Sequence, residues 1–187
     1  MNAEFPELAS SRLRLRALAL HDVDALFALY SDPQVMRHWS HLPWHEPQQA
    51  LAHIERMQRE REQIELYPWA ATLADDDRLI GTCSLFALSR AHARAELGFA
   101  LLPRYWGRGL AREMAALAIE HAFTNLGLSR IEADIDPLNS ASCRLVERLG
   151  FRREGLLRER WRVGDTVQDS AIYGLLARDW RGSGGQT

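Results

Sequence analysis

A short glycine-bearing loop constrains this chain more than any other stretch. The sequence LLPRYWGRGLARE, residues 101–113, runs from an apolar segment through Gly107 and Gly109 into a helical pattern. Glycine lets a ligand approach the backbone closely, and a helix N-terminus offers unpaired N–H groups and the positive end of a dipole. Three arginines add positive charge nearby: Arg104, Arg108 and Arg112. The stretch therefore predicts an anion cradle, most naturally for a phosphate group.

Three kinds of phosphate-binding loop compete for this pattern. A Walker loop ends in Gly-Lys-Ser/Thr, which is absent here. A dinucleotide fingerprint needs a third glycine or alanine three positions after Gly109, where Arg112 stands, and it usually follows the first strand of a parallel sheet. The third form, R-x-x-G-x-G, holds a pyrophosphate on a short loop.

Length, composition and charge exclude several classes of protein. The 187 residues suffice for one mixed domain with its own core, and 47% apolar with 26% charged residues is typical of soluble proteins. A net charge of -2 gives no reason to expect a nucleic-acid partner. Two cysteines, Cys83 and Cys143, indicate no disulfide framework. With no signal-peptide pattern in residues 1–10 and no apolar run of about 18 residues, we expect a cytoplasmic protein without a membrane partner.

Hydrophobic periodicity predicts a mixed α+β fold. We expect a mostly antiparallel sheet with helices on both faces, and a parallel strand pair within residues 93–137 joined by a crossover helix. The sequence indicates one domain, residues 1–180, with a flexible tail at 181–187. Strands are predicted at 11–18, 68–75, 78–88, 93–103, 129–137, 151–163 and 166–177, and helices at 19–32, 46–66, 109–126 and 139–150.

Local signals place the ends and buried faces of these helices. Asp22 is expected to cap the first helix, and Pro47 to stand in the first turn of the second. Leu51, Ile54 and Met57 mark the predicted buried stripe of that second helix.

The loop also carries a resemblance to a known family. RYWGRGLA resembles the acyl-coenzyme A signature Q/R-x-x-G-x-G/A of the GCN5-related N-acetyltransferases (GNAT). Other motifs follow in the order of the ribosomal-protein alanine N-acetyltransferase (RimJ/RimL-type) branch, over residues 11–180: SRLRLRAL, HDVDALFALYSDPQVMRHW, LIGTCSL, AELGFALLPRYWGRGLA, IEADIDPLNSASCRLVERLGF and YGLL. The resemblance implies the GNAT fold, acetyl-CoA as cosubstrate, and transfer of acetyl to a primary amine in a ternary complex.

The resemblance also implies where acetyl-CoA binds. The strand before the loop parts from its neighbour, its backbone pairs with the pantetheine arm, and the loop N–H groups hold the pyrophosphate. Asn139 contacts the pantetheine arm, and Ser142 stands as an acid near the sulfur; the alternative is that both only begin a helix. The implied cofactor-binding residues are Phe99, Ala100, Leu101, Arg104, Trp106, Gly107, Arg108, Gly109, Leu110, Ala111, Asn139 and Ser142.

Two carboxylates compete for the role of general base. Glu159 matches a glutamate proposed as base in relatives and is preferred, while Glu96 lies on the strand that parts. Either could act through a water, and either could instead pair with a neighbouring arginine. Tyr173 ranks third, as a group that holds the thiol, with a core position as its alternative.

Only general chemistry limits the identity of the acceptor amine. An α-amino group has a pKa of about 7.7–8.0 against about 10.4 for lysine, so an N-terminal amine needs less help from a base. A small amine such as a polyamine, amino acid or antibiotic stays open, as do a non-catalytic acyl-CoA-binding module and a homodimer. Trp39, Trp44 and Trp69 are candidate walls of the acceptor pocket or ordinary core residues, and the histidines His38, His41 and His45 do not indicate a metal site.

Overall fold

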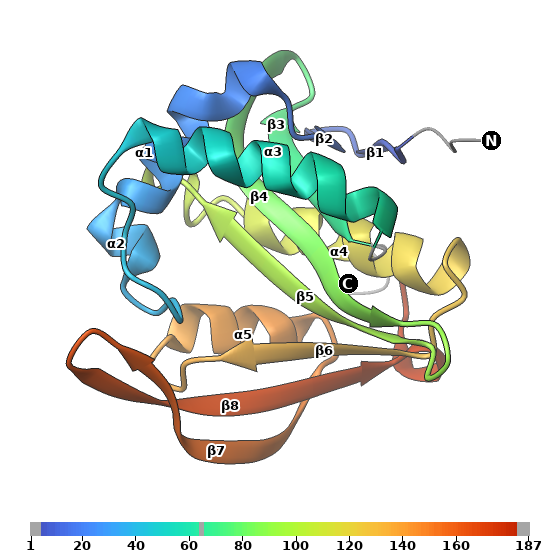
Figure 1. Cartoon of the computed structure of the whole chain (residues 1–187). Coiled ribbons are helices and arrows are strands. Elements are labelled where there is room, and N and C mark those ends of the chain that lie inside the picture. The colour runs from blue at the N-terminus through green and yellow to red at the C-terminus, as the bar shows by residue number, and fades with distance from the viewer. Residues whose placement is uncertain (1–4, 64–65, 183–187) are drawn as a thin grey trace.

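An eight-stranded sheet forms the centre of the computed structural model, which describes residues 5–63 and 66–182 (Figure 1). Its strand order is β1-β2-β3-β4-β5-β6-β8-β7, and every neighbouring pair is antiparallel except β5 with β6. The strands are β1 Leu8–Ala9, β2 Leu13–Ala17, β3 Tyr67–Leu73, β4 Asp76–Ser89, β5 Arg94–Leu101, β6 Arg130–Ile135, β7 Arg152–Val163 and β8 Thr166–Leu176.

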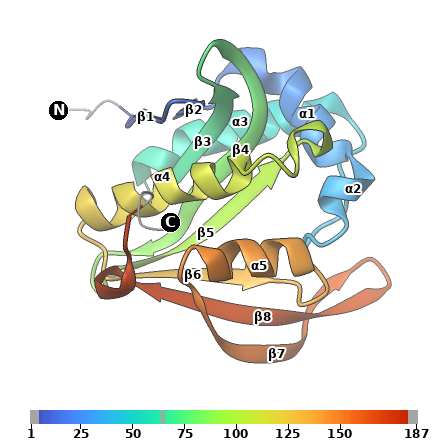
Figure 2. The same cartoon turned by 180° about the vertical axis from the view of Figure 1, so that it is seen from behind.

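Helices cover both faces of this sheet (Figures 1 and 2). On one face lie α1 and α3, with α2 following α1, and their apolar side chains pack on Ala70, Leu79 and Ala100. On the other face lie α4 and α5, which pack on residues such as Leu97, Ile131 and Tyr173. The helices are α1 Val23–Ser31, α2 Pro33–Met36, α3 Pro47–Gln63, α4 Leu110–Thr124 and α5 Ser140–Arg148.

The predicted fold class is confirmed, with small differences in its elements. The parallel pair with its crossover helix is β5-α4-β6, as the spacing predicted. The short strand β1 and the one-turn helix α2 were not predicted, because neither is long enough to show a hydrophobic period. Residues 183–187 of the predicted tail lie outside the described residues.

Two predictions about the helices were wrong. The side chain of Asp22 does not cap α1; its carboxylate accepts hydrogen bonds from the buried guanidinium of Arg16, at 2.7 and 2.8 Å, and from the backbone of Ala19. On α3 the buried stripe contains Ala50 in place of Leu51, which is 38% exposed. Ala50, Ile54 and Met57 follow an i, i+4, i+7 spacing, and that spacing turns Leu51 toward solvent.

Strands β5 and β6 are joined at only one end. Their parallel register runs from Arg94 to Glu96 on β5 and from Arg130 to Glu132 on β6. Beyond it β5 continues to Leu101 beside β4, and β6 continues to Ile135 beside β8, so the two strands diverge (Figure 1). The β6-facing edge of β5 from residue 97 to 101 therefore has no strand partner among the described residues.

None of the helices among the described residues combines the length and the apolar character needed to cross a membrane.

Candidate active site

The glycine loop stands where β5 ends and α4 begins. Gly107 and Gly109 have φ angles of 74° and 77°, in the left-handed region that favours glycine. Gly109 is the N-cap of α4 and has no side chain to satisfy the helix N–H groups. Within the described residues, the N–H groups of Gly107 to Leu110 have no backbone acceptor. They are free to donate to an anion, as the sequence predicted.

Neighbouring groups hold this loop in place. The indole N–H of Trp106 donates to the carbonyl of Leu101 at 2.6 Å, and the guanidinium groups of Arg104 and Arg108 lie 5.1 and 5.8 Å from the ring centroid of Tyr105. The backbone N–H of Trp106 donates to the carbonyl of Pro103 at 3.0 Å. That N–H is thus already bonded and is not among the free donors of the loop, so Trp106 holds the loop in shape and its contact with CoA stays a prediction.

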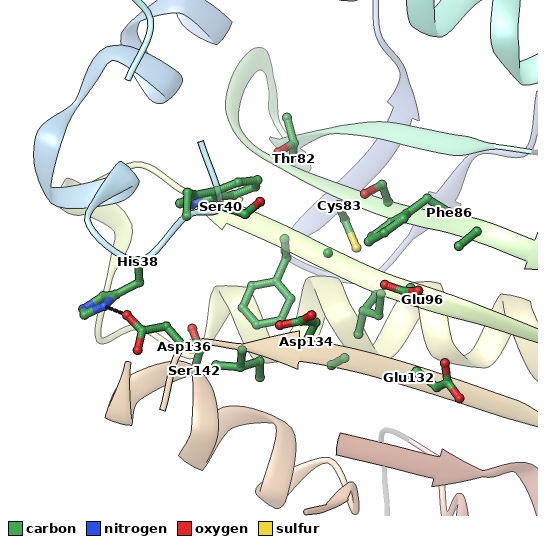
Figure 3. Close-up of a pocket in the computed structure, with 18 of the residues that line it drawn as sticks. His38, Ser40, Thr82, Cys83, Phe86, Glu96, Glu132, Asp134, Asp136 and Ser142 are labelled. Carbon is green, nitrogen blue, oxygen red and sulfur yellow. Dashed lines mark hydrogen bonds and ion pairs between the residues drawn. The ribbon is translucent and has the colours of Figure 1, made fainter. Parts of the chain in front are cut away.

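A cleft of about 970 Å³ lies on the sheet face that carries α1 and α3, where β5 and β6 part. The predicted site residues that line it are Trp39, Trp69, Glu96, Phe99, Asn139 and Ser142. Figure 3 shows Glu96, Glu132 and Asp134 along the middle of this cleft, with His38, Asp136 and Ser142 gathered at one end. The structure therefore brings residues from five separate stretches of the chain to one opening.

Carboxylates dominate the polar lining of this cleft. Glu132 pairs with Arg94 at 3.0 Å and Arg130 at 2.8 Å, and Asp136 with the Nδ1 of His38 at 2.6 Å. Asp134 accepts hydrogen bonds from Ser170 and Trp161. The lining carboxylates are Glu96, Glu132, Asp134, Asp136 and Asp169, against three arginines, Arg56, Arg94 and Arg160.

Glu96 differs from these neighbours because no described residue donates a hydrogen bond to its carboxylate. Glu96 is half-buried and is the last residue of β5 that pairs with β6. It therefore lies at the vertex of the opening, the point where the two strands begin to part. Burial raises the pKa of the Glu96 carboxyl above its ordinary value, and the nearby charges of Glu132 and Asp134 raise it further. A half-buried, unpaired carboxylate of raised pKa is a stronger base than a solvated one.

The preference for Glu159 as base does not agree with this geometry. Glu159 lies in the irregular stretch of β7 between Leu157 and Trp161, with a φ of 53°. Its backbone N–H donates to Asp169 at 2.8 Å, and its side chain lines a small separate hollow with Arg158. Leu157, Arg160 and Trp161 line the main cleft and Glu159 does not. The bulge, invisible in the residue pattern, turns this side chain away.

The helix-start interpretation of Asn139 and Ser142 is confirmed, and their roles toward acetyl-CoA stay predictions. Asn139 is the N-cap of α5, and its Oδ1 accepts a hydrogen bond from the backbone N–H of Ser142 at 3.1 Å. Both residues also line the cleft. The capping bond uses neither the amide N–H groups of Asn139 nor the hydroxyl of Ser142, which remain available to a ligand.

The three tryptophans separate into different roles. Trp39 lines the cleft and packs edge-on against Tyr30, with 5.3 Å between ring centroids. Trp44 packs behind it, 4.7 Å from the Tyr30 ring. Trp69 has no exposed surface, donates to the carbonyl of Pro6 at 2.8 Å and packs against His121 of α4. Trp69 is therefore a core residue, the alternative that the sequence left open, and it also borders the cleft.

Tyr173 is also a core residue. It is buried on the α5 side of the sheet, where its hydroxyl donates to Glu147 at 3.2 Å. Burial raises its pKa, and it does not line the cleft. This is the alternative position that the sequence left open.

The carboxylates of β6 and the residues that pair with them were not predicted from the sequence. Glu132, Asp134 and Asp136 alternate with the buried Ile131, Ala133 and Ile135. Three acids at a period of two on a central strand indicate a charged cleft on one face, because such a strand is usually apolar on both faces. His38 gave no comparable signal, since its partner lies 98 positions away.

Comparison with known proteins identifies the family of this chain. A family described as "Acetyltransferase (GNAT) domain" matches residues 12–152. The uncharacterized N-acetyltransferase p20 of Bacillus licheniformis is 33% identical over 175 residues, covering 94% of this chain and 98% of that protein. YdaF of Bacillus subtilis, a candidate ribosomal N-acetyltransferase, is 31% identical over 122 residues, covering 65% and 67%.

A solved structure extends the likeness to the whole fold. The spermidine N-acetyltransferase of Vibrio cholerae, in complex with CoA and spermine, superposes with a TM-score of 0.81 at 25% identity, covering 91% of this chain and 98% of that one. The chain belongs to the GNAT acetyltransferase family and is an N-acetyltransferase. These relatives include both a candidate ribosomal N-acetyltransferase and a spermidine N-acetyltransferase. The comparisons therefore establish the GNAT family and do not assign the chain to the RimJ/RimL branch.

Proposed function

We propose that this N-acetyltransferase uses Glu96 as its general base, with the acceptor amine in the acidic cleft and acetyl-CoA between β5 and β6. The observation that carries the proposal is the position of Glu96, half-buried and unpaired among the described residues, at the vertex where the two strands part. Glu159 lies outside this cleft and is not needed.

The residues present fit acetyl-CoA. The free N–H groups from Gly107 to Leu110 suit its pyrophosphate, and a Cβ at Gly107 would meet nothing within 4 Å, so that glycine leaves space open. The unpaired edge of β5 suits the pantetheine arm, whose amides can add to a strand edge. Bound acetyl-CoA supplies the thioester carbon that the amine attacks.

Proton transfer is the part of the reaction that this chain's residues perform. Glu96 accepts the proton of the amine, directly or through one water, which leaves a nucleophilic lone pair on nitrogen. An N–H on the parted edge of β5, near Ala100 or Leu101, polarises the thioester carbonyl. The hydroxyl of Ser142 donates to the departing thiolate, a modest task because a thiol has a pKa of about 8.5.

For the acceptor we favour a small amine with more than one positive charge over a protein N-terminus. Five carboxylates and three arginines line the cleft, and Glu96 has no bonded partner among the described residues. Such a lining attracts a cation and holds a second ammonium group while the first reacts. A solved relative was captured with CoA and spermine, which agrees with this choice. YdaF makes an N-terminal acceptor the second candidate.

An amine panel tests the proposal. Release of free CoA is measured with acetyl-CoA and spermidine, spermine, single amino acids, and peptides beginning with alanine or serine. We expect the highest kcat/KM with the polyamines, falling as salt screens the cleft. A higher kcat/KM with the peptides would overturn the acceptor class. CoA binding without transfer to any amine would overturn the enzymatic proposal.

A further inference from the structure

We propose that Arg12 positions the diphosphate-binding loop and offsets a negative charge beside it. This inference rests on the proposed site for acetyl-CoA. Arg12 directly precedes β2 and lies far from the loop in sequence, and its guanidinium reaches both the loop backbone and the first turn of α4. Its action is indirect, through Arg108 and Glu113.

The first contact fixes a peptide plane in the loop. The Nη1 of Arg12 donates to the carbonyl oxygen of Arg108 at 3.0 Å. In a trans peptide the C=O and the following N–H point in opposite directions, so holding the Arg108 carbonyl aims the N–H of Gly109 the other way. This peptide joins Arg108 to Gly109, in a loop whose two glycines have positive φ and few steric limits on their conformation. Arg12 thus orders a donor that the pyrophosphate needs.

The second contact concerns an unfavourable charge. Glu113 lies in the first turn of α4, close to the proposed diphosphate site. The Nε of Arg12 donates to its Oε2 at 2.7 Å, the Nη2 of Arg12 binds the same oxygen, and Ser10 donates to Oε1 at 2.5 Å. Both carboxylate oxygens are therefore engaged on the side of β2. Without Arg12 this carboxylate would repel the diphosphate and compete for the helix N–H groups.

Arg12 is not simply a surface ion pair. A neighbouring arginine two positions along, Arg14, makes an exposed pair with Asp77 and touches no part of the loop. Arg12, in contrast, also donates to the carbonyl of Arg108, and the side chain of its ion-pair partner Glu113 is only 19% exposed. Arg14 therefore offers a matched control, since it removes the same side chain from the same edge of the fold.

The test compares ligands with and without the diphosphate. CoA affinity is measured by calorimetry, which needs no acceptor, and kcat/KM is measured with acetyl-CoA and with S-acetylpantetheine, which lacks the diphosphate. For Arg12→Ala we expect CoA affinity to fall about tenfold, because a positioned charge-assisted contact is lost. We expect kcat/KM with S-acetylpantetheine to stay within about twofold of the parent, and Arg14→Ala to leave both unchanged.

A double-mutant cycle separates the indirect role from direct contact with the ligand. Glu113→Gln removes the charge and keeps the shape, so in the Arg12→Ala background it should restore part of the lost CoA affinity. Unchanged CoA affinity in Arg12→Ala, an equal loss with S-acetylpantetheine, or no coupling to Glu113→Gln would each overturn the inference. Failure of the parent protein to bind CoA would overturn the proposed site itself, so the two failures are distinguishable.

Discussion

The two edges of β5 are paired to very different extents. Toward β4 the register runs from Arg94 to Leu101, whereas toward β6 it ends at Glu96. Buried backbone N–H and C=O groups are almost always bonded, so an edge left open inside a sheet calls for another partner. The paired edge thus builds the fold, and the open edge is where we propose that a ligand takes the place of a strand.

The largest expected effect is on activity at the vertex between these edges. Glu96→Gln keeps the size of the side chain and removes the base, so kcat should fall by roughly 10²- to 10⁴-fold. Glu159→Gln serves as the control and should keep activity near the parent level, because its side chain lies outside the cleft. Full activity in Glu96→Gln, with loss of activity in Glu159→Gln, would instead support Glu159 as the general base, as the sequence suggested.

The next effect is on the stability of the paired edge. A Cβ at Gly81 of β4 would lie 2.3 Å from the carbonyl oxygen of Ala100 on β5, a backbone atom that cannot move aside. Gly81→Ala should therefore lower the free energy of unfolding by about 3 kcal/mol. Gly155→Ala on β7 should cost little, since a Cβ there meets nothing within 4 Å. Denaturant unfolding measures both, and equal stability of the two variants would contradict this account.

A smaller effect is expected in the loop at the end of the open edge. Gly107→Val should lose CoA affinity by at least about tenfold, because a branched side chain at positive φ strains the loop by about 1–2 kcal/mol and crowds its N–H groups. Gly127→Val is the matched control: its φ of 66° carries the same strain, and its surroundings are equally empty. Both variants should lose similar thermal stability, and only Gly107→Val should bind CoA weakly by calorimetry.

The paired parts of the molecule were predictable from sequence because side-chain periodicity reports burial. Ile131, Ala133 and Ile135 alternate as a strand must, and the glycines mark the loop. The parting of β5 from β6 leaves no such pattern in the sequence. The packing of whole strands, and not the identity of single residues, decides which backbone groups form hydrogen bonds. The expectation of a splayed sheet came from the family resemblance and not from residue spacing.

Errors at the site have the same origin. Glu159 was misplaced because a bulge reverses the direction of a side chain without changing the residue pattern. The two alternatives for Trp69 could not be separated because β3 is buried on both faces, so its ring could face either the cleft or α4. Arg12 was seen only as part of an alternating strand, since its partners lie about 100 positions away.

The smallest expected effect is a pH-dependent change in stability at Glu96. Burial raises the pKa of this carboxyl in the folded protein, so the folded state binds its proton more tightly than the unfolded state does. The stabilising contribution of Glu96 is then present below the unfolded pKa of about 4.3 and is lost as the pH rises through the folded pKa. Glu96→Gln should therefore gain thermal stability relative to the parent as the pH rises from about 4 to about 8.

Glu154 supplies the control of opposite sign. A hydrogen bond from Arg130 lowers the pKa of the Glu154 carboxyl, so its contribution is present above the unfolded pKa and is lost as the pH falls through the folded pKa. Glu154→Gln should accordingly lose stability relative to the parent as the pH rises to about 5, with little further change above that pH. Thermal melts from about pH 3 to about pH 8 measure both differences. If the two variants shifted in the same direction, Glu96 would be a paired carboxylate like its neighbours, and the vertex of the open edge would lose its base.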